Sequence, residues 1–85
     1  MMESELFHNL TLQPGQNLED FYSSVVDKGI LLQKHEHEVM AKFIRGLPNK
    51  MAIFVRARHP TDTQTAFASA KRAEVCGYRE IPLIQ

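Results

Sequence analysis

The densest group of side chains that could do chemistry is His35-Glu36-His37-Glu38, which offers two imidazoles and two carboxylates as possible metal ligands. Histidines on one helix converge on a metal ion only when they are three or four residues apart. A spacing of two residues points the rings of His35 and His37 about 200° apart around a helix. We therefore interpret this segment as a polar helix start, where carboxylates favour the positive end of the helix dipole.

Three other reactive side chains stand alone in the sequence. His8 and His59 are isolated, and Cys76, between Val75 and Gly77, has no histidine in a recognisable catalytic frame. We expect Cys76 to be a buried or half-buried structural thiol. A glycine-rich phosphate loop and a Gly-x-Ser-x-Gly elbow are both missing from the sequence. These observations predict a protein that is not an enzyme, with no metal and no cofactor.

Charge is balanced along these 85 residues, with ten Lys and Arg against ten Asp and Glu. Binding to phosphate backbones usually needs a basic excess, so we expect no direct nucleic acid binding by this domain. Near-zero net charge also removes long-range repulsion between copies. The basic clusters Arg56-Ala57-Arg58 and Lys71-Arg72 are interpreted as solvated helix faces, with a polyanion contact or an oligomer seam as the alternative.

The sequence gives no sign of a membrane or secretory segment. No apolar stretch approaches the roughly 20 residues that span a bilayer. The start, Met1-Met2-Glu3-Ser4, lacks the basic and apolar regions of a signal peptide, and the single cysteine favours a reducing compartment. We therefore expect a cytoplasmic protein that makes no membrane contact.

Apolar spacing and turn residues predict an all-α fold, a compact bundle of about five short helices in one domain. Asn17 and Thr61 or Asp62 are expected N-caps, and Gly46 and Gly77 are expected to be left-handed residues after helices. Gly29 interrupts a helix, which we interpret as a close approach of two helices. The expected helices are residues 3–10, 18–33, 35–45, 48–58 and 62–76, with a tail at 79–85. The expected core residues are Val39, Phe43, Leu47, Phe54 and Phe67.

Three motifs in a fixed order resemble a known family. The stretch from Gln13-Pro14-Gly15 to Phe21-Tyr22 is similar to the major homology region of Gag capsid proteins. The stretch Phe43-Ile44-Arg45-Gly46-Leu47-Pro48 resembles the Phe-x-x-Gly-Leu-Pro signature of gypsy-type LTR retrotransposon Gag. Pro60-Thr61 and the following alanine-rich segment resemble the last helix of the same capsid lobe. The resemblance covers residues 10–78.

This resemblance implies the C-terminal lobe of a capsid protein, the fold shared with retroviral capsids and the neuronal protein Arc. It also implies a structural role, in which lobes pair across a two-fold axis and link Gag subunits into a shell. Ser24 or Val25 stands where many relatives carry an arginine, so an arginine-centred network in the homology region is not expected, although Gln13 and Glu19 are able to keep part of it. The homology-region residues with implied structural roles are Gln13, Gly15, Glu19, Phe21 and Tyr22.

The third expected helix is the implied dimerisation helix. If Val39, Phe43 and Leu47 face inward, Met40 and Ile44 lie near its exposed edge, which His37 and Ala41 continue. The predicted homodimer interface is therefore His37, Met40, Ala41 and Ile44. In the alternative, Met40 and Ile44 complete the domain's own core. Other functions left open are a domesticated Arc-like adaptor, which binds partner peptides or forms RNA-carrying particles, and a peptide-binding module without a shell.

Overall fold

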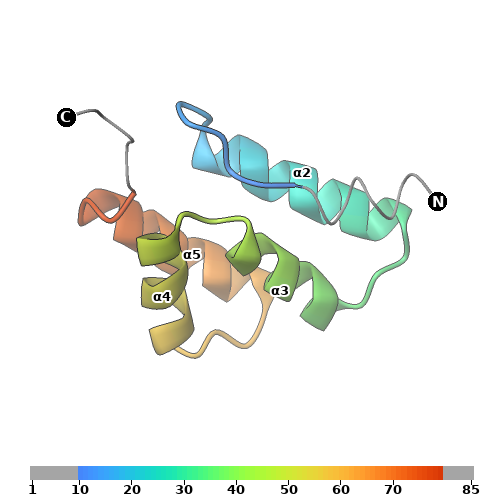
Figure 1. The fold of residues 1–85 in the computed structure, drawn as a ribbon. Coiled ribbons are helices and arrows are strands. Elements are labelled where there is room, and N and C mark those ends of the chain that lie inside the picture. The colour runs from blue at the N-terminus through green and yellow to red at the C-terminus, as the bar shows by residue number, and fades with distance from the viewer. Residues whose placement is uncertain (1–9, 80–85) are drawn as a thin grey trace.

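The computed structural model describes residues 10–79, in which the chain forms four helices (Figure 1). They are α2 (Leu18–Leu31), α3 (Glu36–Arg45), α4 (Asn49–Ala57) and α5 (Thr63–Val75). No strand is present among residues 10–79, so the predicted all-α class is confirmed. The predicted helix at 3–10 lies outside the described residues except for Leu10, and the predicted tail at 79–85 except for Arg79.

The helix ends follow local capping chemistry. The Asn17 side chain accepts the Glu19 N–H at 3.1 Å at the start of α2. The same helix ends at Leu31, two residues earlier than expected, because Gln33 adopts a left-handed φ of 56°. The Lys34 N–H then donates to the Gly29 carbonyl at 2.8 Å, which completes the reversal into α3. The other predicted helix boundaries differ from the observed ones by one residue or less.

Gly46 corrects a prediction about backbone conformation. Its φ of −80° is right-handed, so it is not the left-handed residue expected after α3. A Cβ atom at this position would lie 2.5 Å from Cζ of Phe21 and 2.8 Å from the Leu10 carbonyl oxygen. Glycine is therefore needed here for close packing. At Gly77, by contrast, φ is +84°, the left-handed geometry expected after the last helix.

The core is organised around the buried ring of Phe43. The ring centroids of Phe21, Tyr22 and Phe67 lie 5.5, 5.6 and 6.3 Å from it. These rings come from α2, α3 and α5, so one aromatic cluster joins three helices. Among the expected core residues, Val39, Phe43 and Leu47 are buried, and Phe54 and Phe67 are partly buried against the core.

Helix α2 packs against α3, which lies below α2 in Figure 1, through two close contacts. One is the Phe21–Gly46 contact. The other is at Gly29, where an added Cβ would lie 2.5 Å from Cγ2 of Val39. Because valine is β-branched and stiff at χ1, that methyl group has little freedom to move away. The close approach expected at Gly29 is therefore observed, and this glycine sets the separation of the two helices.

We predict that Gly29→Ala destabilises the protein by about 1–2 kcal/mol. Overpacking against Val39 costs roughly 1–3 kcal/mol, of which the better helix propensity of alanine offsets up to about 1 kcal/mol. The measurement is urea unfolding of both variants in a double-mutant cycle with Val39→Ala. In the Val39→Ala background the obstructing methyl groups are gone, so Gly29→Ala should become neutral or stabilising. An equal effect in both backgrounds would contradict the close-contact explanation.

Candidate assembly surface

The predicted dimer strip on α3 is only partly on the surface. His37 and Ala41 are exposed, Met40 is partly buried against the core, and Ile44 is only 6% exposed. The placement of Ile44 at an exposed edge is therefore wrong, since its side chain belongs to the core of the lobe. The apolar pair Met40 and Ile44 mostly packs within the domain, which is the alternative that the sequence left open. What remains outside on α3 is polar or small.

Lys42 shows how α3 is seated on the rest of the lobe. Its side chain is 8% exposed, although lysine is rarely buried. Burial, and to a lesser degree the neighbouring Arg45 guanidinium, lowers the pKa of Lys42. The buried side of α3 therefore includes Lys42 in addition to Val39, Phe43 and Ile44.

The residues of the first motif, Gln13 to Tyr22, hold one corner of the domain together. Gln13 and Gly15 form a turn, in which Gly15 has a φ of +81° and the Gln16 N–H donates to the Gln13 carbonyl at 2.9 Å. The Glu19 carboxylate accepts from Lys71 Nζ of α5 at 3.1 Å. The rings of Phe21 and Tyr22 belong to the aromatic cluster, with Tyr22 stacked on Phe67 at 4.2 Å. These residues act on packing within the lobe.

Sequence reasoning missed Arg79, which anchors the same corner. Its guanidinium donates to the Gln13 and Gln16 carbonyl oxygens at 2.9 and 2.6 Å and pairs with the Glu74 carboxylate at 2.8 Å. An arginine therefore does bind the homology-region turn, but it comes from the far end of the chain. Partners 63 and 66 residues away leave no local pattern in a sequence. The basic residue just after the last helix was the only available signal.

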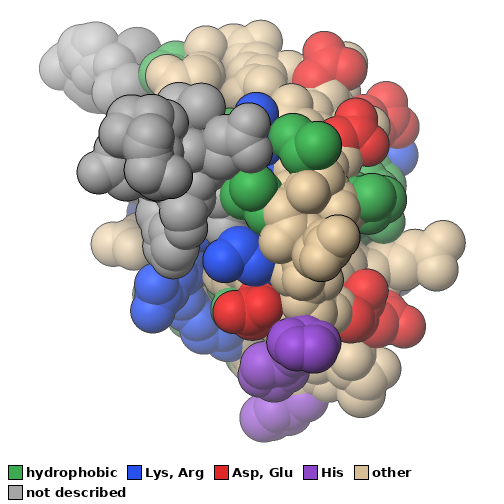
Figure 2. All heavy atoms as spheres, turned by 90° about the vertical axis from the view of Figure 1, so that its right-hand side faces the viewer, with side chains coloured by type: hydrophobic (Ala, Val, Ile, Leu, Met, Phe, Trp, Pro, Cys, Tyr) green, Lys and Arg blue, Asp and Glu red, His purple; other side chains and the backbone are tan. Residues whose placement is uncertain are grey.

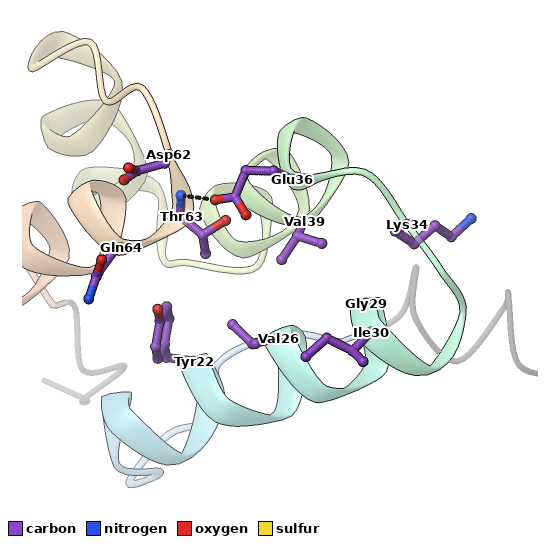
Figure 3. Close-up of a pocket in the computed structure, with 10 residues that line it drawn as sticks. All are labelled: Tyr22, Val26, Gly29, Ile30, Lys34, Glu36, Val39, Asp62, Thr63 and Gln64. Atoms are coloured by element: carbon purple, nitrogen blue, oxygen red, sulfur yellow. Dashed lines mark hydrogen bonds between the residues drawn. The ribbon is translucent and has the colours of Figure 1, made fainter.

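A groove of about 640 Å³ lies between α2, the start of α3 and the start of α5 (Figure 3). Tyr22, Val26 and Ile30 point into it from α2, because a spacing of four residues keeps them on one side of the helix. Val39 points toward them from α3. The middle of the groove is therefore apolar. Its ends are polar, with Lys34 at one end and Asp62, Thr63 and Gln64 at the other.

A hydrogen bond between two helix starts forms the polar end of the groove. The Glu36 carboxylate, in the first turn of α3, accepts the Thr63 N–H of α5 at 2.6 Å (Figure 3). The carboxylate thus satisfies a backbone donor that α5 itself leaves free. Thr63 is 4% exposed, and its Oγ1 has no hydrogen-bond partner among the described residues. This contact fixes the distance between α3 and α5 beside the groove.

Two consecutive apolar side chains are exposed where α2 ends. Ile30 is 71% exposed and Leu31 is 60% exposed. Figure 2, which looks onto this end of the molecule, shows a few hydrophobic side chains set among polar ones, with histidine side chains below them. We name the exposed pair Ile30 and Leu31, at the end of α2 beside the connection to α3, the α2–α3 end surface. Ile53 on α4 and Val75 on α5 are also exposed, at 63% and 88%.

The residues considered for catalysis or metal binding do not converge. His35, His37 and His59 are exposed, and His8 lies outside the described residues. Cys76 is exposed just after α5, so the expectation of a buried or half-buried thiol is wrong. Within residues 10–79, no group of three or more His, Cys, Asp or Glu side chains could hold a metal ion.

Comparisons of the chain with protein-family models, curated proteins and solved structures found no match. Among residues 10–79, no helix has both the length and the apolar character needed to cross a bilayer.

We predict that Arg79→Ala destabilises the lobe by about 1–3 kcal/mol, because three charge-assisted hydrogen bonds are lost from a side chain that is 17% exposed. Arg79→Lys should recover little, since an ammonium cannot reproduce the guanidinium fork. Chemical denaturation measures both effects, with the exposed Arg56→Ala as the control of equal charge change. If Arg79→Ala were no more harmful than Arg56→Ala, the anchoring role would be refuted.

Asp62 gives the α5 start a pH dependence. Hydrogen bonds from the Thr65 side chain and backbone hold the pKa of Asp62 below its ordinary value. Because the folded-state pKa is the lower one, this stabilisation is present above the unfolded pKa and is lost as the pH falls through the folded value.

We therefore predict that Asp62→Ala lowers the Tm at pH 7, and that the difference from wild type is full above about pH 5 and shrinks below about pH 4. Thermal unfolding followed by circular dichroism from pH 7 to pH 3 measures it. Asp27→Ala, an exposed carboxylate within α2, is the control. A Tm difference that stays constant down to pH 3 would show that the ionised cap is not responsible.

Proposed function

We propose that this chain is the C-terminal lobe of a Gag-type capsid protein, similar to those of gypsy-type LTR retrotransposons. In this proposal it is a structural, non-enzymatic domain of cytoplasmic particles, and its homotypic dimer contacts link subunits into a capsid shell. Support comes from the order of three motifs across residues 10–78 and from the four-helix arrangement, in which each motif has a physical role.

Each motif contributes to the packing of one lobe. The first supplies the turn held by Arg79 and the two rings of the aromatic cluster. The second supplies Phe43 and the close-packed Gly46. The third supplies α5, whose Ala66, Ala70 and Ala73 are completely buried. The residues of all three motifs therefore contribute to packing, as expected for a domain with a structural role.

The observation that carries the proposal is the exposure of Ile30 and Leu31 at the α2–α3 end surface. Contact with a second copy would bury these two aliphatic side chains, which is favourable by roughly 1–2 kcal/mol for each. His37 and Ala41 of the predicted strip are exposed on the side of α3 that faces away from Val39 and α2. We assign the dimer contact to the α2–α3 end surface, with Ile30 and Leu31 supplying the apolar side chains in place of Met40 and Ile44. Equal numbers of basic and acidic residues leave no net charge to oppose pairing.

We predict a concentration-dependent dimer that Leu31→Ser weakens by about tenfold or more in Kd, because a two-fold contact loses the side chain twice. Sedimentation equilibrium from micromolar to millimolar protein measures the mass, and circular dichroism checks the helical content. Ile53→Ser is the matched control, since Ile53 has almost the same exposure but lies on α4. Loss of the dimer with Ile53→Ser, and not with Leu31→Ser, would contradict the assignment.

The second candidate function is an Arc-like adaptor that binds partner peptides. The apolar wall formed by Tyr22, Val26, Ile30 and Val39 favours it, because an extended or helical peptide can seat apolar side chains there. A strict monomer at millimolar concentration would reject the dimer proposal and leave this candidate. Electron microscopy of the protein with its flanking segments would then look for particles.

A further inference from the structure

Positive charge is concentrated in one part of a chain that is neutral overall. Between Glu38 and Asp62 the sequence has no acidic residue. The same interval contains five basic residues: Lys42, Arg45, Lys50, Arg56 and Arg58. It covers most of α3 and all of α4. Balanced overall composition therefore conceals a local basic excess.

Two arginines that are 14 residues apart in sequence meet at one hollow. Arg58, just after α4, and Arg72, on α5, line a depression of about 300 Å³ together with Thr65, Ala68 and Ser69. The four residues from α5 share one side of that helix, since they are spaced by three, four and seven positions. Each of the two basic clusters of the sequence thus contributes one arginine to this hollow, and neither cluster alone predicts it.

Among residues 10–79, neither guanidinium is paired with a carboxylate. Lys71 pairs with Glu19 at 3.1 Å and Arg79 pairs with Glu74 at 2.8 Å, but Arg58 and Arg72 have no ion pair among residues 10–79. The Arg58 guanidinium lies 5.4 Å from the centre of the Phe54 ring, a cation–π contact that limits its freedom. One of the two donors is therefore already partly ordered beside the hollow.

The groups at the hollow are suited to a phosphate. Guanidinium groups donate pairs of parallel hydrogen bonds to phosphate oxygens. Ser69, 7% exposed, adds a hydroxyl at the wall. The Thr65 hydroxyl is already hydrogen-bonded to the Asp62 carboxylate, so it is not counted as a donor. The remaining donors come from Arg58, Arg72 and Ser69.

We propose that this hollow is a phosphate-binding site, in which Arg58 and Arg72 together bind one phosphate group of a polyanion and Ser69 hydrogen-bonds to it. The site lies on α4 and α5 and shares no residue with the α2–α3 end surface. Its existence therefore does not depend on the proposed self-association, and either proposal can fail alone.

The test is a titration of ¹⁵N-labelled protein with sodium tripolyphosphate, followed by NMR at low ionic strength. Chemical-shift changes should concentrate at the amides of Thr65, Ser69 and Arg72 and at the Nε–H signals of Arg58 and Arg72. The double variant R58Q/R72Q should raise the Kd roughly tenfold. The matched control R45Q/R56Q removes the same charge from exposed positions that do not line the hollow, and it should change the Kd less than twofold.

A second arm identifies the source of the phosphate. The same titration with a ten-nucleotide single-stranded RNA shows whether a phosphodiester backbone is bound. If the hollow responds to both probes, the site accepts phosphodiesters; if it responds to tripolyphosphate alone, the ligand is a compact polyphosphate. No response to either probe would overturn the proposal. So would an equal loss of binding in R58Q/R72Q and R45Q/R56Q, because that result means diffuse attraction to positive charge.

Discussion

The arrangement of this lobe depends on the burial of one ring, Phe43, between three helices. Because interiors are close-packed, the rings of Phe21, Tyr22 and Phe67 can surround it only if α2 comes very near α3. Glycines permit this at two points, since an added Cβ at Gly46 or Gly29 would overlap a side chain of the other helix. The groove beside Val39 is the space left where α2 and α5 diverge from that contact.

Polar contacts fix the ends of the elements that the apolar core brings together. Glu36 binds the Thr63 N–H at the start of α5, Lys71 pairs with Glu19, and Arg79 binds the homology-region turn. Lys71 is half exposed, so its pair contributes little to stability. Arg79 is largely buried and binds two carbonyl oxygens, so it contributes more. Together these contacts join α2, α3, α5 and the Gln13–Gln16 turn.

Most of the fold could be predicted from local chemistry, whereas contacts between residues distant in the sequence could not be predicted. Asn17 and Asp62 cap helices near the predicted starts, because capping involves neighbours only. Ile44 was placed wrongly because periodicity gives an angle around α3 but not the width of the face that other helices cover. The contacts of Arg79 and the Arg58–Arg72 hollow could not be predicted, because helix packing brings together residues that are far apart in the sequence. Gly46 was predicted to be a left-handed residue, but glycine is required there because the Phe21 ring leaves no room for a Cβ atom.

Charge segregation determines how the two proposed surfaces influence each other. With ten charges of each sign, the lobe has no net repulsion to overcome at the α2–α3 end surface. A bound phosphodiester group adds about one negative charge near Arg58 and Arg72, but at physiological salt its field is screened beyond about 8 Å. If both proposals hold, a bound phosphate would act on assembly only where the basic α4–α5 faces of neighbouring subunits come that close. There it would relieve their mutual repulsion and leave the proposed apolar contact at Ile30 and Leu31 unchanged.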